Sequence, residues 1–137
     1  MITSSQQHNA SKEAANDLRK MLLAEPDPDI PTGLVAVNRK RLKKKLTTIE
    51  KDIKEYEESV KLDLSTLKFD KFEDLLKAPI RYRLANNESV KEFAEEVGIN
   101  KRQILRYEEE AYQNCSIPTL FKILDHIGVR ITGEIKI

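Results

Sequence analysis

Ser89–Glu108 reads SVKEFAEEVGINKRQILRYE and contains the signals for two short helices joined by a tight turn. Ser89 is a helix N-cap residue, and Glu92 follows three residues later, the pattern of a reciprocal capping box. Gly98 supplies the left-handed backbone that ends the first helix, and Asn100 caps the second. The local signals therefore predict a helix, a turn and a second helix within this stretch.

An apolar wedge is expected between these two helices. Ala94 is small and faces inward, which lets the helices approach closely. The wedge itself is predicted to consist of Phe93, Val97, Ile99, Ile104 and Tyr107. This combination of caps, turn and wedge is typical of a helix-turn-helix.

The second helix carries long hydrogen-bonding side chains at its first, second, third and sixth positions. They are Lys101, Arg102, Gln103 and Arg106. Arginine and lysine pair with guanine edges, and glutamine with adenine, when a helix N-terminus enters the major groove of DNA. A charged, solvated face on a small helical hairpin is the alternative interpretation. The helix-turn-helix frame favours base-edge contacts over that alternative.

Several motifs around this unit carry a resemblance to a known family. The first is an opening helix with basic residues at Ile80–Ala85, and the last is a Ser-capped helix at Ser116–Leu124. Between them lie two sequence motifs, Glu-x-Ala-Glu-x-x-Gly-Ile at Glu92–Ile99 and Ile-x-x-Tyr-Glu at Ile104–Glu108. With these motifs, residues 78–128 resemble the lambda-repressor-like, Xre-type helix-turn-helix domain.

A narrower resemblance covers the end of the second helix and the loop after it. The stretch Gln103–Ser116, together with a Glu-Tyr-Glu element at Glu55–Glu57, is similar to the antitoxin-type branch of bacterial Xre regulators. The resemblance implies a repressor that binds a palindromic double-stranded operator, as the antitoxin of a type II toxin–antitoxin pair that represses its own operon. A cognate toxin is then a possible protein partner.

Carried over to this chain, the resemblance implies two sets of DNA contacts. Base edges would be contacted by Lys101, Arg102, Gln103 and Arg106, although Gln103 could instead contact a phosphate. Phosphates would be held by Ser89, Asn100, Gln113 and Asn114.

Three positions depart from the family pattern. Val90 replaces a glutamine that many relatives carry, and Glu109 with Glu110 replaces a glycine after the Tyr-Glu pair. Valine cannot hydrogen-bond a phosphate, and two carboxylates would repel DNA if they faced it. These departures leave open an alternative function: a protein-interaction module, toxin-neutralising or scaffolding, whose degenerate helix-turn-helix no longer binds DNA.

A heptad pattern of apolar residues precedes this domain. From Leu42 to Val60 the spacings are 4, 3, 4, 3 and 4, which predicts a long amphipathic, coiled-coil-like helix. Self-association as a homodimer is expected through Leu42, Leu46, Ile49, Ile53, Tyr56 and Val60. The basic half, Arg39–Lys45, and the acidic half, Glu50–Glu58, favour antiparallel or hairpin-like packing. The basic run is either a solvated face or a surface that contacts a partner or phosphates.

The chain is thus predicted to be all-α, with one exception at its end. Four parts are expected: a flexible N-terminal segment at 1–33 with a short helix from Ser11 to Ala24, a helical self-association region at 34–77, the helix-turn-helix domain at 78–128, and a C-terminal pairing strand at 129–137. Pro79 is expected to break or restart a helix. The strand is predicted because Val129, Ile131, Ile135 and Ile137 alternate.

Composition excludes several classes of protein. The 137 residues carry a formal net charge of +1, contain no apolar run of membrane-spanning length, and begin without an apolar signal core, so a soluble cytoplasmic protein with no membrane contact is expected. One cysteine, Cys115, and two histidines, His8 and His126, predict no metal site. His126 is interpreted as a helix C-terminal residue. No motif predicts a cofactor or an enzyme.

Overall fold

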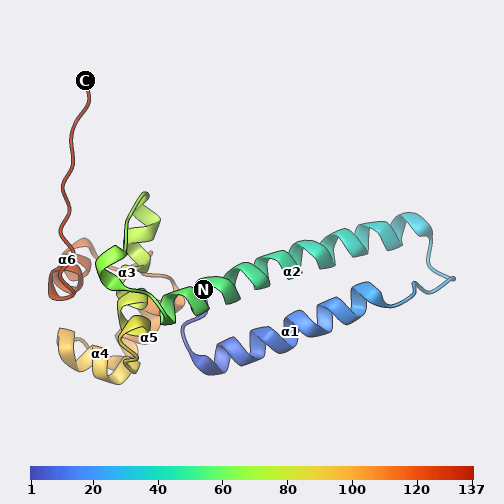
Figure 1. The fold of residues 1–137 in the computed structure, drawn as a ribbon, viewed down its shortest axis with the longest axis horizontal. Coiled ribbons are helices and arrows are strands. Elements are labelled where there is room, and N and C mark those ends of the chain that lie inside the picture. The colour runs from blue at the N-terminus through green and yellow to red at the C-terminus, as the bar shows by residue number, and fades with distance from the viewer. The chain divides into compact units, whose positions relative to one another are not determined.

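The computed structural model describes residues 1–137 and contains six α-helices, one short 3-10 helix and no β-strand (Figure 1). The chain divides into two compact units, Met1–Glu58 and Ser59–Ile137. None of the helices combines the length and the apolar character needed to cross a membrane. The mostly helical class predicted from the sequence is therefore confirmed.

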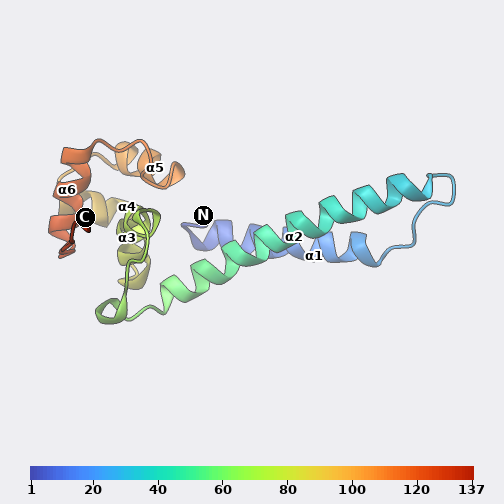
Figure 2. The ribbon, with the colours of Figure 1, turned by 90° about the horizontal axis from the view of Figure 1, so that it is seen from above.

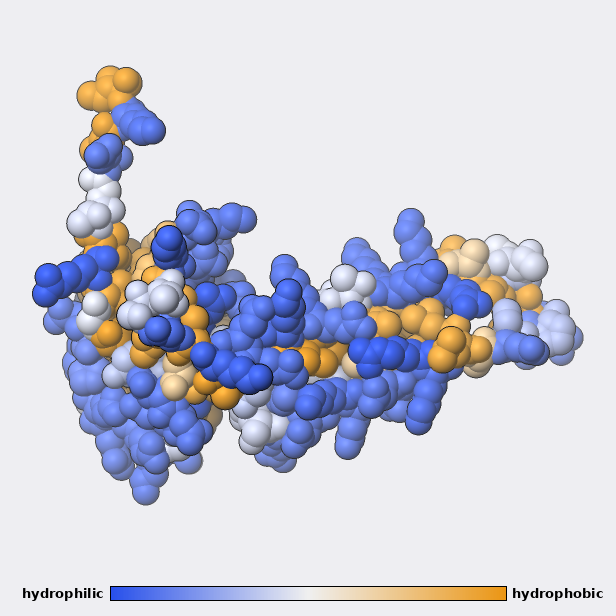
Figure 3. All heavy atoms as spheres, viewed as in Figure 1, coloured by the Kyte–Doolittle hydropathy of each residue, from blue (hydrophilic) through white to orange (hydrophobic).

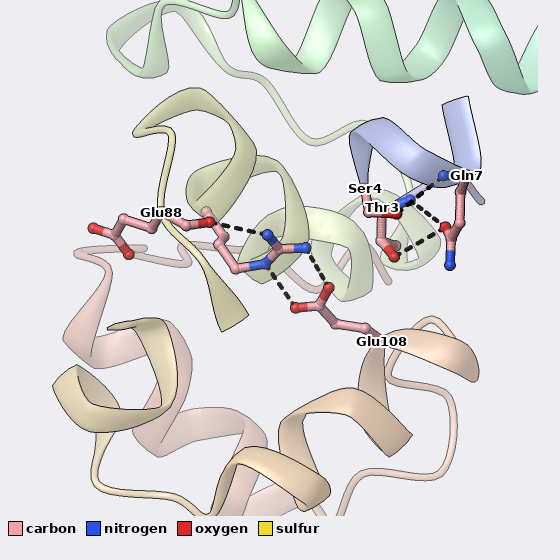
Figure 4. A network of polar contacts seen from close by, with 6 residues as sticks. Thr3, Ser4, Gln7, Glu88 and Glu108 are labelled. Atoms are coloured by element: carbon pink, nitrogen blue, oxygen red, sulfur yellow. Dashed lines mark hydrogen bonds and ion pairs between the residues drawn. The ribbon is translucent and has the colours of Figure 1, made fainter. Parts of the chain in front are cut away.

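The first unit is a hairpin of two long helices. Helix α1 (Ser5–Leu23) lies beside α2 (Thr32–Val60) and runs in the opposite direction, as both ribbon views show (Figures 1 and 2). The Ser4 hydroxyl caps α1 by accepting a hydrogen bond from the Gln7 amide at 3.2 Å (Figure 4). Because of this cap α1 begins earlier than the predicted Ser11, and the expectation of weak structure before that residue is wrong.

The apolar stripe of α2 lies against α1 of the same chain. Ala15 and Leu18 of α1 are buried, and the α2 residues Leu42, Leu46, Ile49, Ile53 and Tyr56 are half-buried. The His8 and Tyr56 rings stack with centroids 4.7 Å apart, and Arg19 pairs with Glu50 at 3.0 Å. In Figure 3 an apolar band accordingly runs lengthwise along the hairpin between hydrophilic margins. The heptad pattern thus has a partner within the chain, and the side chains on it are only partly covered.

The second unit is a cluster of short helices. It contains a 3-10 turn (Leu64–Thr66), α3 (Phe72–Ala85), α4 (Val90–Val97), α5 (Lys101–Glu109) and α6 (Ile117–His126). Helix α4 packs on both α5 and α6, and α3 packs on α6. The largest fully buried side chains are those of Tyr112, Phe93, Ile80, Ile104, Ile123 and Pro79.

Helix α3 crosses the boundary that was predicted between residues 77 and 78. Pro79 lies inside this helix and does not break it. Leu75 and Ala78 before the proline are buried, as are Ile80 and Leu84 after it, so both halves of the helix contribute to one core. Proline has no backbone N–H and so removes one hydrogen bond from the helix, and tertiary packing on both sides of Pro79 offsets this loss.

The predicted C-terminal strand is wrong. Residues 129–137 form no strand, and the side chains of Ile131 and Ile135 are 63% and 92% exposed. Alternating apolar residues favour extended backbone, but a strand also needs a neighbouring strand whose carbonyl and amide groups can pair with it. This chain supplies no such neighbour, because the rest of the unit is helical.

Candidate nucleic-acid interface

The turn between α4 and α5 is built by the residues that the sequence singled out. The Ser89 hydroxyl accepts a hydrogen bond from the Glu92 amide at 3.1 Å, although the reverse bond of a capping box is not formed. Gly98 ends α4 in the left-handed region at φ 70°, and the amide of Ile99 donates to the Ala94 carbonyl at 3.0 Å. The Asn100 side chain accepts from the Arg102 amide at 2.8 Å and so starts α5. The predicted helix, turn and helix are therefore confirmed.

Replacing Gly98 with alanine tests the importance of this turn. The added methyl group would make only an ordinary van der Waals contact, with Lys122 Nζ at 3.8 Å, so the penalty comes from the left-handed backbone alone. We expect a loss of about 1–2 kcal/mol in the free energy of unfolding, measured by urea denaturation. The control is Gly133→Ala, at an exposed position with no positive φ, where a loss of that size would contradict the explanation.

Buried side chains hold the two helices together. Phe93, Val97 and Ile104 are buried, whereas Ile99 and Tyr107 are half-buried at the edge of the contact. Ala94 is 3% exposed and makes room for the close approach of α4 and α5. The predicted wedge is thus present, and it fixes which side of α5 faces solvent.

The outer face of α5 carries three exposed cations. Lys101, Arg102 and Arg106 are exposed, whereas Gln103 is half-buried. At about 100° per residue, the apolar Leu105 falls on the same outer face, and its side chain is 41% exposed. Leu105 has no role among the residues predicted from the sequence; its only signal there is an apolar residue at an outward position. An apolar side chain at such a place can contact a thymine methyl group.

Acidic residues follow this face at the C-terminal end of α5. Glu109 and Glu110 are both exposed, and Glu109 lies on the same side of the helix as Lys101 and Arg102, about two turns further on. The positive electrostatic potential that would attract DNA is therefore concentrated at the first two turns of α5.

The residues expected to hold phosphates occupy three separate places in the second unit. Ser89 and Asn100 are exposed and use their side-chain oxygens as helix caps. The groups that remain available to a phosphate are the unpaired backbone amides at the N-termini of α4 and α5, which favour anions. Gln113 and Asn114 are exposed in the loop between α5 and α6.

A buried ion pair that sequence reasoning missed ties α5 to α3. The Arg83 guanidinium donates to Glu108 through Nε at 2.9 Å and through Nη2 at 2.6 Å, and Nη1 donates to the Glu88 carbonyl oxygen at 3.0 Å (Figure 4). The two side chains are only 6% and 3% exposed. Burial raises the pKa of Glu108, and the hydrogen bonds and charge of Arg83 oppose that rise. The pair fixes the orientation of the helix that bears the exposed cations.

A cluster of three acids lies along α4: Glu88 precedes the helix, Glu92 is in its first turn and Glu96 in its last. Burial is the largest of the effects that raise the pKa of Glu88 to about 7. The hydrogen bond and charge of Glu96 and the charge of Glu92 act in the same direction, and His126 acts in the opposite one. His126 Nε2 itself lies 3.5 Å from Glu96 Oε2. Burial raises the pKa of Tyr82 of α3, and the charges of Glu88 and Glu96 act in the same direction.

The Glu88 cluster predicts a pH-dependent stability. The pKa of Glu88 is about 7 in the folded chain, against an ordinary value of 4.5, so the folded state holds this proton more tightly than the unfolded state does. The protonated Glu88 therefore contributes its full stabilisation below pH 4.5, and this contribution is lost as the pH rises through 7. We expect Glu88→Gln to flatten the decline in unfolding free energy between pH 5 and 8, measured by urea denaturation. Glu95→Gln, which removes an exposed carboxylate from α4, should keep the wild-type profile. Equal slopes for wild type and Glu88→Gln would contradict the prediction.

No group of three or more His, Cys, Asp and Glu side chains in residues 1–137 is arranged to hold a metal ion. Cys115 lies in the loop before α6, where burial raises the pKa of its thiol, a shift opposite to the one that activates a cysteine nucleophile.

Comparisons with known proteins agree with this geometry. Searches of curated proteins and of solved structures found no match to the chain. Residues 80–133, which include most of α3 and all of α4, α5 and α6, match the Xre/lambda-repressor-like helix-turn-helix family model, and this match indicates DNA-binding transcription regulation.

Proposed function

We propose that this protein is a sequence-specific transcriptional repressor that inserts α5 into the major groove of its operator. The observation that carries the proposal is the outer face of α5, where Lys101, Arg102 and Arg106 are exposed within the segment that matches the helix-turn-helix family. Leu105 adds an apolar contact to this face, and Gln103 contributes from its edge. Phosphate contacts come from Gln113, Asn114 and the helix starts at Ser89 and Asn100.

The narrower part of the proposal is an antitoxin that represses its own operon. It is supported by the similarity of Gln103–Ser116 to antitoxin-type regulators. The corresponding partner is a small toxin encoded next to this gene, and both would act in the cytoplasm. Co-purification of the adjacent gene product with this chain tests this part, and failure of the two proteins to associate would restrict the proposal to a repressor.

A palindromic operator requires two copies of the domain. We propose a homodimer that uses the apolar stripe of the hairpin, because α1 leaves Leu42, Leu46, Ile49, Ile53 and Tyr56 only half covered and Val60 is 42% exposed. A second hairpin that packs along the open edge of this stripe would bury the remaining apolar surface. Sedimentation equilibrium of the full chain tests the proposal, and a monomer at micromolar concentration would contradict it.

The central experiment measures binding to the protein's own upstream DNA. A fluorescent duplex of that sequence is titrated with the full chain at a fixed salt concentration, next to a scrambled duplex of equal length and composition. We expect tighter binding to the upstream DNA by about 10³-fold or more, the usual ratio between specific and non-specific sites. Equal affinity for the two duplexes would refute sequence-specific repression.

A second candidate function is a protein-interaction module that has lost DNA binding. The observation that favours it is the exposure of Glu109 and Glu110 next to the cations of α5, together with Val90 at the first position of α4, where no side-chain donor is available to a phosphate. Glu109→Gln with Glu110→Gln separates the two functions. The variant should bind duplex DNA more tightly if α5 lies in the groove, and no differently if the chain does not bind DNA there.

A further inference from the structure

We propose that the basic segment of α2, Arg39–Lys45, is a second DNA-binding surface that contacts phosphates without reading sequence. The proposal rests on the proposed function, because that function supplies duplex DNA as the ligand whose phosphates the segment contacts. It adds a site in a different unit of the chain, since the basic segment belongs to Met1–Glu58 and the α5 face to Ser59–Ile137.

The geometry of the basic segment is the first argument. Six of its seven residues are Arg or Lys, and all six are exposed, whereas Leu42 is half-buried. Arg39 donates to the carbonyl oxygen of Leu22 at the end of α1. At about 100° per residue, the other five cations cover about 200° of the helix circumference, and Leu42 takes the side that faces α1. The segment therefore presents positive charge over the sides that point away from Leu42 and α1.

The ion pairs of the hairpin are the second argument. Three acids of the other half of α2 already have partners within the chain. Glu50 pairs with Arg19 at 3.0 Å and Glu58 with Lys54 at 3.8 Å, and Glu57 Oε1 lies within hydrogen-bond distance of His8 Nε2, at 3.0 Å. By contrast, Lys40, Arg41, Lys43, Lys44 and Lys45 take part in no ion pair within the chain. The charge of the basic segment is thus left uncompensated locally, although the whole chain is nearly neutral.

The distribution of these cations favours phosphates over a second helix. A helix that docked on this side would need an apolar stripe to pack against, and the five cations leave none. Duplex DNA instead offers one negative charge per about 1.7 Å of axis, and flexible lysine side chains around a helix can reach several phosphates at once. The basic segment is about 10 Å long, which matches several phosphates of one groove wall.

The test uses the full chain carrying Lys43→Gln, Lys44→Gln and Lys45→Gln together. Glutamine keeps the helix propensity and removes three charges. Binding to a labelled random-sequence duplex is measured by fluorescence anisotropy from 50 to 300 mM NaCl. We expect the slope of log affinity against log salt to fall by about 2.7 in magnitude, because each lost phosphate contact removes about 0.9. Affinity at 100 mM salt should fall by about tenfold or more.

The matched control removes the same number of charges from residues next to the acidic half of α2. It carries Lys51→Gln, Lys54→Gln and Lys61→Gln and should keep the wild-type slope. Circular dichroism checks that both variants keep their helices. An unchanged slope in the Lys43–Lys45 variant, an equal fall in the control, or a wild type that does not bind random duplex at 50 mM salt would each overturn the inference.

Further arms distinguish this inference from its rivals and from the proposed function. If the Lys43–Lys45 variant loses self-association in sedimentation and keeps its DNA affinity, the basic segment binds a second copy and the inference is overturned. If the wild type does not prefer its upstream DNA but the slope on random duplex still falls in the variant, sequence-specific repression fails and the phosphate surface stands.

Discussion

Replacing Arg83 with methionine is expected to lower the free energy of unfolding of the second unit, Ser59–Ile137, by about 3–5 kcal/mol. The change leaves the Glu108 carboxylate buried without the two hydrogen bonds that it accepts from the guanidinium. It also removes the hydrogen bond to the Glu88 carbonyl oxygen. A buried, uncompensated charge is expensive because the protein interior solvates it poorly. Urea denaturation of the full chain, followed by circular dichroism, measures the loss.

Two variants show whether the buried pair is the cause. Arg106→Met removes the same kind of side chain from an exposed position of α5 and should change stability by less than about 0.5 kcal/mol. Arg83→Met combined with Glu108→Leu removes both charges and should recover most of the loss, because two apolar side chains can replace a buried ion pair. An Arg83→Met variant as stable as Arg106→Met would contradict the role given to this pair.

Replacing Arg102 and Arg106 together with alanine is expected to weaken the preference for the upstream DNA sharply. Each well-placed contact with a base edge contributes about 1–3 kcal/mol of discrimination, so the double variant should lose at least about 30-fold in specificity. The two side chains are exposed, so the fold should be unaffected. Competition between the upstream duplex and a scrambled duplex measures the loss.

A matched control removes two exposed cations elsewhere in the same unit. Arg130→Ala with Lys136→Ala lies in the C-terminal tail outside the α5 face and should keep the preference for the upstream DNA. If the Arg102 and Arg106 variant still discriminates as well as wild type, these two residues are not the base-reading residues. If the control loses the preference equally, only net charge matters.

Local signals in the sequence were sufficient for the helix-turn-helix. Ser89, Gly98 and Asn100 act through hydrogen bonds and backbone angles within a few residues, so their pattern predicts the structure directly. The exposure of Lys101, Arg102 and Arg106 follows from the period of the α-helix, because these residues lie on the outer side of α5 when Ile104 is in the core.

The predictions that failed depend on packing partners. The alternating tail after Val129 lacks a neighbouring strand, and Pro79 is tolerated because buried residues flank it on both sides. For the polar start of α1, the Ser4 cap outweighed the poor burial of the residues after it.

By itself, the sequence determined the helical class, the turn between α4 and α5, and the presence of an apolar stripe on α2. Only the tertiary structure decided that α1 covers this stripe and that Arg83 meets Glu108, a residue 25 positions away. The physical reason is that caps, turns and periodicity are set by neighbouring residues. Contacts between distant segments instead depend on which buried charges and apolar faces find partners when the whole chain packs.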